Sequence, residues 1–504
     1  MTTFQKRLEV RRAYTCNTAP TPHSSNHAFS MYPQVFLTFC LLCLSLGMNA
    51  QEEINPKDYR IEKKDLNRAL TLINTPLKEE VVFPNPAAGA QWFPQAGLGL
   101  FMHWGIHSVD GVQPSWNMIQ HYRYAGRDPH TVKQYYALAL KFNPQNYNPE
   151  RYLEACKKAG FTYAVLTTRH HDGYALWPSK YGIGTKQYMG GRDLIKEYVD
   201  ACHKTGMRVG LYYSPRDWHF PGCMDKREFD ANTRKDLPPI TDSVGNYRQY
   251  VNFIAYTMAQ LEELLTRYGK IDVLWLDGAS WRGINEKNTE KIYAWIRSIQ
   301  PDIVINDRWS NIVDPDNPAG TSMRIGDFTT PFECGMPTYV PSKWWEAENL
   351  WTTGGGWGYD KEGNFRTLSW FFDNYIATRS LGGNFLINVG PDENGNMKPK
   401  FYQEIDSLAS WMTYGHESVA GSQPTPGMEL CNVRLTSRGT DTLYAHVLPN
   451  SPAQISLKTD RKPREVTLLR NERAIQGMWR DGFLHFMIPQ DERTNLDDVV
   501  RISF

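Results

Sequence analysis

The sequence has almost no surplus of charge of either sign. Lysine and arginine together number 55, aspartate and glutamate together number 54, and the formal net charge of the 504 residues is +1. Proteins that mainly bind nucleic acid carry a basic surplus, because they must neutralise phosphates. The balance therefore excludes nucleic acid as the expected partner.

The sequence also lacks an apolar run long enough to cross a membrane, which takes about 20 residues. The run Val35–Leu46 is shorter, and small and polar residues follow it, as they do at the cleavage site of a secretory signal peptide. We therefore expect residues 1–50 to be an N-terminal extension and signal peptide, with Met1 or Met31 as the true start. We expect an exported protein without a membrane span: periplasmic in a Gram-negative bacterium, otherwise secreted or lysosome-like.

Cysteine is scarce, and no two cysteines form a CxxC pair. Neither Cys40 nor Cys43 is preceded by the small residues of a lipoprotein signal, so no lipid anchor is predicted. Five scattered cysteines remain after the signal region: Cys156, Cys202, Cys223, Cys334 and Cys431. This spacing argues against a disulfide framework and against a cysteine metal site. Since the HExxH motif is absent too, we expect no metal and no cofactor.

What the chain does contain is a recurring pattern of an apolar strand that ends in polar residues, with amphipathic helices between the strands. The pattern predicts strands at Leu98–His103, Tyr163–Thr168, Val209–Tyr213, Val273–Leu276, Ile303–Asn306 and Phe385–Val389. It predicts helices at Pro149–Ala159, Asp193–Thr205, Val251–Tyr268, Thr289–Ile299 and Leu368–Arg379.

This alternation predicts an α/β fold, specifically a (β/α)8-like TIM barrel. The alternative is a doubly wound open sheet. It is disfavoured because no GxGxxG follows the first strand and because the polar strand ends are spread over many strands.

After Tyr414 the pattern changes to short alternating runs separated by turn residues, which is typical of an antiparallel β-sandwich. These runs are Leu443–Leu448, Ile455–Leu457, Val466–Leu469, Phe483–Ile488 and Val499–Ile502. A Gly/Ser/Pro-rich stretch at Gly421–Gly427 marks the boundary. We therefore expect a catalytic barrel over residues 51–420 and a C-terminal sandwich over residues 421–504.

The predicted strand Val273–Leu276 ends at Asp277, which a glycine follows. The carboxyl ends of parallel barrel strands open onto the ligand-binding face, so this strand delivers a carboxylate there. Asp277 is therefore the first candidate for chemistry. Two structural roles remain open at this point: capping of the next helix and pairing with a buried arginine.

Other strand ends carry side chains suited to binding hydroxyl groups, namely His103, His170, His171 and Tyr213. A neutral imidazole both donates and accepts hydrogen bonds, which suits the hydroxyls of a sugar. A metal site formed by His170, His171 and Asp172 is an alternative, but adjacent residues at a strand end point in divergent directions. Histidines buried for structural reasons are the other alternative.

Arg308 stands at the strand end after that of Asp277, placed either to bind substrate hydroxyls or to neutralise a carboxylate. If Asp277 is a glycosidase nucleophile, a second carboxyl group must protonate the leaving oxygen. The candidates are Glu333, Glu346 and Glu348. They lie on the long, aromatic, Gly-rich segment Asp327–Tyr359, which we predict to be a loop on the active face.

Several long motifs, taken together and in order, resemble the α-L-fucosidases of glycoside hydrolase family 29. The resemblance runs from about Trp92 to the C-terminus. The motifs are FMHWGIHS (Phe101–Ser108), TTRHHDGYALW (Thr167–Trp177), GLYYSPRDW (Gly210–Trp218), VLWLDG (Val273–Gly278), NDRW (Asn306–Trp309), WWEAENLWTTGGGWGY (Trp344–Tyr359) and NFLINVGPDENG (Asn384–Gly395).

The resemblance implies roles for particular residues. Asp277 matches the nucleophile, and Arg308 matches the arginine of the family. The remaining expected substrate contacts are Phe101, His103, Trp116, His170, His171, Trp177, Tyr213 and Trp275, with Trp177 against the apolar face of the sugar.

The chain departs from the family pattern at two places. Ser115 stands where the family usually has a glutamate before tryptophan. The family commonly has its acid/base in a Thr-Pro-Glu context, whereas this chain has one intervening residue in TTPFECG (Thr329–Gly335). We expect Glu333 to be the acid/base, with Glu346 as the alternative.

The resemblance implies an exo-acting, retaining α-L-fucosidase whose substrate is a fucosylated oligosaccharide or glycoconjugate. Two alternatives stay open. One is an α-L-galactosidase or related exo-glycosidase on the same scaffold, and the other is a non-catalytic carbohydrate-binding protein. The sequence predicts neither the linkage preference nor the oligomeric state.

Overall fold

The computed structural model describes residues 59–118, 130–220, 244–277, 286–310 and 324–504. The expected extension and signal peptide at residues 1–50 lie outside the described residues. Among the described residues, no helix combines the length and apolarity that a membrane crossing requires.

Eight parallel strands form one sheet in the order β5-β4-β3-β2-β1-β8-β7-β6. An isolated parallel bridge between Asn306 and Phe328 joins the β5 end of this sheet to β6 and closes the barrel. The strands are β1 (Leu98–Met102), β2 (Tyr163–Arg169), β3 (Arg208–Tyr213), β4 (Val273–Leu276), β5 (Val304–Ile305), β6 (Phe328–Thr329), β7 (Trp344–Leu350) and β8 (Asn384–Asn388). The predicted TIM-barrel class is therefore confirmed.

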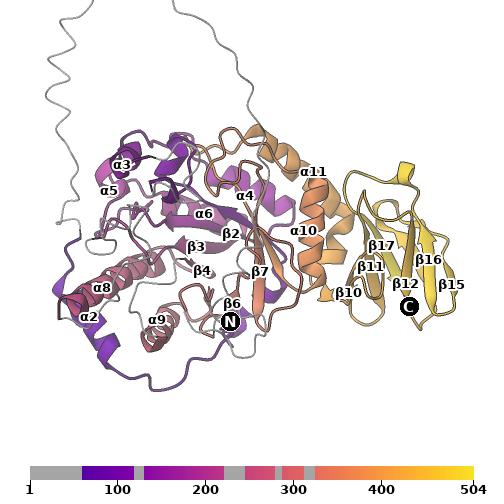
Figure 1. Cartoon of the computed structure of the whole chain (residues 1–504), viewed down its shortest axis with the longest axis horizontal. Coiled ribbons are helices and arrows are strands. Elements are labelled where there is room, and N and C mark those ends of the chain that lie inside the picture. The colour runs from indigo at the N-terminus through magenta and orange to yellow at the C-terminus, as the bar shows by residue number, and fades with distance from the viewer. Residues whose placement is uncertain (1–58, 119–129, 221–243, 278–285, 311–323) are drawn as a thin grey trace, which may run out of the picture. The chain divides into compact units, whose positions relative to one another are not determined.

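The barrel strands are apolar along their whole length because both of their faces are covered. Inside, aromatic and branched side chains pack together, among them Phe101, Tyr163, Tyr212, Trp275 and Leu386. Outside lie the helices α2 (Lys63–Asn74), α4 (Pro149–Lys158), α6 (Leu194–Thr205), α8 (Val244–Arg267), α9 (Glu286–Ile299), α10 (Leu368–Ser380) and α11 (Pro399–Val419) (Figure 1). The interior is thus a packed core, and ligand access is restricted to the ends of the strands.

Helix boundaries follow from capping residues. The Asp193 side chain accepts a hydrogen bond from the Lys196 N–H at the start of α6, and Gly206 adopts the left-handed conformation that ends it. At α4, Asn148 caps the helix and Pro149 occupies its first turn. These signals explain why the predicted bounds of both helices agree with the structure within one residue.

The segment Asp327–Tyr359, predicted as a loop, contains two barrel strands. Residues Trp344–Leu350 form β7, which pairs with β8 and with β6. The prediction failed because two glutamates interrupt the apolar pattern expected of a buried strand. Their side chains lie inside the protein, and this placement bears on the chemistry of the site.

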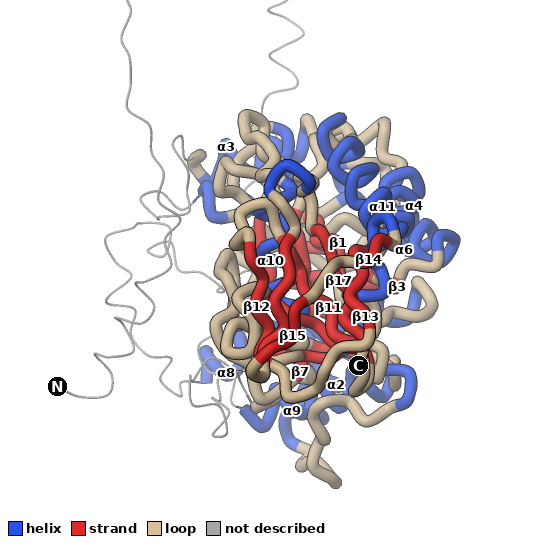
Figure 2. Tube along the Cα trace, turned by 90° about the vertical axis from the view of Figure 1, so that its right-hand side faces the viewer, coloured by secondary structure: helices blue, strands red, loops and turns tan. Residues whose placement is uncertain are grey.

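Two antiparallel sheets follow α11, in the orders β14-β13-β17-β11-β10-β9 and β12-β16-β15. Figure 2 views the molecule from the side on which these strands lie. Their bounds are β9 (Gln423–Pro424), β10 (Arg434–Arg438), β11 (Thr442–Val447), β12 (Gln454–Lys458), β13 (Glu465–Leu468), β14 (Arg473–Ala474), β15 (Met478–Arg480), β16 (Phe483–Met487) and β17 (Asp498–Ser503).

The two sheets enclose their own apolar core, which includes Leu435, Val447, Leu457 and Phe486. The Trp411 indole on α11 donates to the carbonyl oxygen of Asp497 at 2.8 Å. Residues 61–504 cluster as one compact unit. The division at residue 420 stays a prediction, although the first antiparallel strand begins just after it.

Candidate active site

Asp277 follows β4 and lies at the mouth of the barrel. Arg308, which follows β5, donates to its Oδ1 from Nη2 at 2.9 Å and from Nε at 3.2 Å. Tyr212 on β3 donates to its Oδ2 at 2.8 Å. Three neighbouring strands thus hold one carboxylate through both of its oxygens.

These contacts fix the charge of Asp277. Burial by itself raises the pKa of this carboxyl group, but the Arg308 guanidinium and the Tyr212 hydroxyl hold the pKa well below its ordinary value. Only about a sixth of the side chain is exposed, at 17 %. Asp277 is therefore ionised, oriented and nearly dry, as a nucleophile must be.

His103 presents a hydrogen-bond acceptor to the mouth. The Asn388 amide donates through Nδ2 to the carbonyl of Trp357 at 2.7 Å, so its Oδ1 faces His103 and accepts from Nδ1 at 2.8 Å. The other ring nitrogen then carries a lone pair. Burial lowers the pKa of His103 to about 4, which keeps the ring neutral.

His171 is held in the same tautomer. The Ser214 hydroxyl donates to the carbonyl of Arg216 at 2.7 Å, so it accepts from Nδ1 of His171 at 2.6 Å. Nε2 of His171 then faces Oδ2 of Asp277 at 3.8 Å. Burial lowers the pKa of His171 to about 3, so the ring is neutral despite the nearby carboxylate.

His170 is held by Ser115. The Ser115 hydroxyl accepts the Asp172 N–H at 2.9 Å and lies 2.6 Å from Nδ1 of His170. The same hydroxyl hydrogen-bonds the Asp172 carboxyl group, so Ser115 joins His170 to Asp172. Burial lowers the pKa of His170, so this ring is neutral as well. Neutral donors and acceptors around one carboxylate suit the hydroxyl groups of a sugar.

Aromatic rings surround these polar groups. The His170 ring is stacked on Tyr212, with centroids 5.5 Å apart. Trp116 contacts the rings of both His171 and Trp218. Trp357, beyond β7, lies 5.0 Å from the His103 ring. Such walls favour a ligand with apolar faces between its hydroxyls.

Arg308 also reaches a second carboxyl group at the mouth. Its Nη1 lies 3.1 Å from Oε2 of Glu333, whose side chain is 45 % exposed. The guanidinium therefore connects a partly buried, ionised carboxylate with a more accessible carboxyl group. Arg308 thus brings two carboxyl groups to the same end of the barrel.

Comparisons with known proteins agree with this geometry. The family model described as alpha-L-fucosidase matches residues 81–417. The tissue alpha-L-fucosidase of Bos taurus is 28% identical over 374 residues, which span 71% of this chain and 74% of the relative. The human tissue enzyme is 27% identical over 350 residues, 66% of this chain and 69% of the relative.

The chain belongs to the α-L-fucosidase family.

Solved structures support the assignment. Alpha-L-fucosidase isoenzyme 1 from Paenibacillus thiaminolyticus superposes with a TM-score of 0.68 at 28% identity, covering 82% of this chain and 98% of that one. An alpha-L-fucosidase of family 29 from Bacteroides thetaiotaomicron, trapped as a covalent intermediate, superposes with a TM-score of 0.70 at 23% identity. It covers 85% of this chain and 99% of its own, and it supports the fold.

Within this fucosidase fold, the structure contradicts the expected role of Tyr213. Its hydroxyl donates to Gln260 on α8 at 3.0 Å, outside the barrel. Tyr212 pairs in register with Trp275, and Tyr213 pairs with Leu276. Since Asp277 shares a face with Trp275, the alternation of side chains along a strand places Tyr212 in the site. The expectation of Tyr213 was therefore wrong, and the two-residue spacing between Trp275 and Asp277 is the signal that could have indicated Tyr212 instead.

The structure also contradicts the expected contact of Trp177 with the sugar. The residue is fully buried, and its indole N–H donates to Glu263 on α8 at 2.9 Å. A ring without exposure offers no face to a ligand. Trp357, whose ring lies 5.0 Å from that of His103, provides the aromatic wall at the mouth that the resemblance implies for Trp177.

Glu346, the alternative acid/base, lies too deep for that role. It accepts hydrogen bonds from Trp275 at 2.6 Å and from Tyr163 at 2.8 Å, and it has no exposed surface. Burial raises its pKa to about 7, although both of these hydrogen bonds lower it. Phe101 and Trp275 belong to the same buried layer, beneath the polar groups at the mouth.

The structure groups a different set of possible metal ligands from the one that the sequence suggested. The Asp172 carboxyl group accepts from Tyr135 and from the Tyr174 N–H, so it does not accompany His170 and His171. These histidines instead bring ligand atoms within 4.8 Å of Asp277. Arg308 already forms an ion pair with that carboxylate, so a metal cation bound there would be repelled by the positive guanidinium. The absence of a metal stays a prediction.

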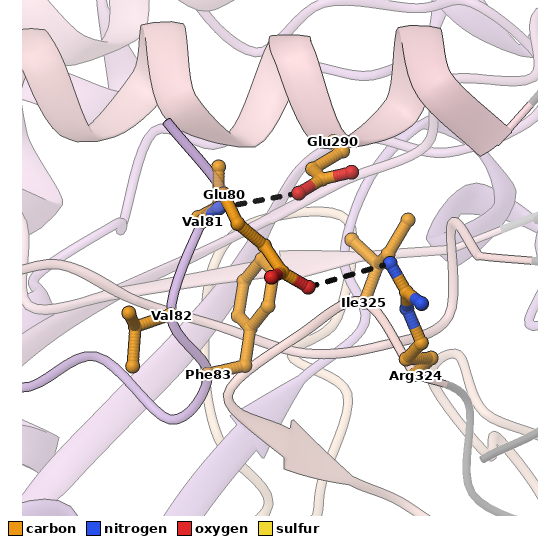
Figure 3. Close-up of a pocket in the computed structure, with 7 residues that line it drawn as sticks. All are labelled: Glu80, Val81, Val82, Phe83, Glu290, Arg324 and Ile325. Carbon is orange, nitrogen blue, oxygen red and sulfur yellow. Dashed lines mark hydrogen bonds and ion pairs between the residues drawn. The ribbon is translucent and has the colours of Figure 1, made fainter. Parts of the chain in front are cut away.

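A separate hollow of about 330 Å³ lies beside α9 (Figure 3). Glu290 accepts the Val81 N–H there at 3.2 Å, and Glu80 lies 3.8 Å from Arg324. None of the residues discussed above lines this hollow. It therefore adds nothing to the chemistry at Asp277.

Proposed function

We propose that this chain is an exo-acting, retaining α-L-fucosidase in which Asp277 is the nucleophile and Glu333 is the acid/base. The observation that carries the proposal is the double engagement of Arg308. Its guanidinium binds the ionised Asp277 on one side and the exposed Glu333 on the other. Such a pair supports double displacement at an anomeric carbon.

In the first step, an Asp277 oxygen attacks the anomeric carbon while Glu333 gives its proton to the departing oxygen. The bond to the leaving group breaks, and a glycosyl ester of Asp277 forms. In the second step, Glu333 takes a proton from water, and the hydroxide attacks the same carbon from the opposite side. Two inversions return the original configuration.

The neutral histidines would bind the substrate. His103 and His171 offer acceptors, and His170 offers a third neutral imidazole to the hydroxyl groups of the sugar. The substrate class proposed is a glycan or glycoconjugate with a terminal α-L-fucosyl residue. The apolar run Val35–Leu46 supports the further proposal that the enzyme is exported.

The replacement of the usual glutamate by Ser115 does not favour the α-L-galactosidase alternative. Ser115 is fully buried, and its hydroxyl is bonded to His170 and to the Asp172 N–H. It therefore adds no space at the mouth for a hydroxymethyl group. Neutral acceptors and an ionised nucleophile likewise favour an enzyme over a binding protein.

The test compares aryl α-L-fucoside with aryl α-L-galactoside as substrates of the wild-type protein. Turnover of the fucoside is expected, with Asp277→Ala reducing it by a factor on the order of 10⁴ or more. Azide should rescue Glu333→Ala through a fucosyl azide of retained configuration. Glu346→Ala is the matched control. Its rescue in place of Glu333→Ala would reassign the acid, and preference for the galactoside would reject the substrate.

A further inference from the structure

Glu348 is a buried carboxyl group beside the catalytic pair. It lies on β7 two residues after Glu346, so both side chains point into the barrel, with Glu348 nearer the mouth. Its Oε1 lies 3.3 Å from Nη1 of Arg308, and 1% of its side chain is exposed. Its Oε2 has no hydrogen-bond partner among the described residues.

Arg308 thus has three carboxyl partners. Nε and Nη2 face Asp277, while Nη1 is shared between Glu333 at 3.1 Å and Glu348 at 3.3 Å. Nη1 also lies 3.3 Å from the Thr330 hydroxyl. The state of Glu348 therefore decides how much of the guanidinium charge reaches Glu333.

The proposed reaction moves one negative charge across Arg308. Before the first step Asp277 is a carboxylate and Glu333 is an acid. After it, Asp277 is a neutral ester and Glu333 is a carboxylate. Because Arg308 contacts both groups, its guanidinium stays next to the negative charge in both steps, provided that no third carboxylate forms an ion pair with it.

Every group that faces Glu348 bears on its ionisation. Burial raises the pKa of Glu348 well above its usual range, Glu333 and Glu346 raise it further, and Arg308 and Thr330 oppose the rise. An ionised carboxylate with one unpartnered oxygen in this dry position would pay a large desolvation penalty. The neutral acid is the favoured form.

We propose that Glu348 is a positioning residue that meets Arg308 as a neutral acid and so leaves the guanidinium charge to Asp277 and Glu333. A backbone contact of Glu348 also helps to position Glu333. The carbonyl oxygen of Glu348 accepts the N–H of Cys334 at 2.8 Å, which anchors the turn that carries Glu333. This role rests on the proposed function.

Two substitutions separate the neutral-acid role from mere packing. Glu348→Gln keeps a neutral acceptor of the same shape, so kcat/KM and its pH profile should stay within about threefold of the wild type. Glu348→Met fills the same volume without an oxygen. Nη1 then pairs with Glu333 alone and favours its carboxylate form.

The two variants are assayed on α-L-fucosides with a good and a poor leaving group, since only the poor one needs the acid. For Glu348→Met, kcat/KM should fall at least about tenfold on the poor leaving group, with the alkaline limb at lower pH, and less than about threefold on the good one. Equal losses on both substrates would indicate a packing role and overturn the proposal.

A loss of more than about 30-fold in Glu348→Gln would also overturn it, because that is the behaviour of an ionised group. Infrared difference spectra supply a readout besides activity: the wild type should show a protonated carboxyl band that Glu348→Gln lacks. An unchanged band would contradict the neutral acid. A wild type inactive on both fucosides would instead reject the proposed function itself.

Discussion

The Tyr212 hydroxyl lies 2.8 Å from Oδ2 of Asp277, whereas the hydroxyl of the next residue, Tyr213, lies 3.0 Å from Gln260 on the opposite side of the strand. Two identical side chains thus take positions inside and outside the barrel. Replacing each tyrosine by phenylalanine therefore gives two matched variants, which remove the same hydroxyl from adjacent residues on opposite faces of β3.

Tyr212→Phe removes the donor to Oδ2 of the nucleophile. A hydrogen bond to a charged group contributes about 1.5–3 kcal/mol, so we expect kcat/KM on aryl α-L-fucoside to fall by about 10- to 150-fold. Tyr213→Phe should change it by less than about threefold. A larger loss in Tyr213→Phe would show that the strand faces the other way.

The sequence predicts the barrel and most strand ends because each strand joins a continuous apolar run to a polar end. Asp277 and Arg308 follow directly from that pattern. The choice between Tyr212 and Tyr213 does not follow from it, because a run of buried residues does not show which side chains point into the barrel. The only local indication is that Asp277 lies two residues after Trp275 and therefore on the same face of the strand.

Other residues required tertiary information. The contacts of Trp177 with α8 and of Glu346 with Tyr163 link positions 86 and 183 residues apart. No local pattern encodes them. Strand β7 was missed for a physical reason as well, because carboxyl groups inside a barrel are rare unless neighbouring groups stabilise them. Here an indole, a phenol and a guanidinium do so.

Ser115 holds the His170 ring by a hydrogen bond of 2.6 Å from a strained backbone position, with φ at 57°. Ser115→Ala and Ser115→Gly both remove the hydroxyl, so both should raise KM by about tenfold, equivalent to a hydrogen bond of about 1.4 kcal/mol. Glycine tolerates the left-handed conformation, so Ser115→Gly should melt at a higher temperature than Ser115→Ala. Wild-type KM in both variants would rule out the role assigned to the hydroxyl.

Glu346 makes the stability of the fold depend on pH. Its folded pKa of about 7 is raised from 4.5, so the protonated form is favoured in the folded state. The stability it contributes is fully present below the unfolded value and is lost as pH rises through about 7. The loss is up to about 3 kcal/mol at higher pH.

Glu346→Gln stays neutral, so its melting temperature relative to the wild type should rise between pH 5 and pH 8. Thermal unfolding at the two pH values measures this difference. A constant difference for Glu346→Gln would mean that the carboxyl group is ionised throughout.

The central claim is that Asp277 forms a covalent bond to the sugar. Treatment with 2-deoxy-2-fluoro-L-fucosyl fluoride, followed by proteolysis and peptide mass spectrometry, locates that bond directly. The account predicts one fluorofucosyl group on the peptide that carries Asp277, and no labelling of Asp277→Ala. A label on another carboxylate, or an inverted sugar as the first product observed by NMR, would contradict it.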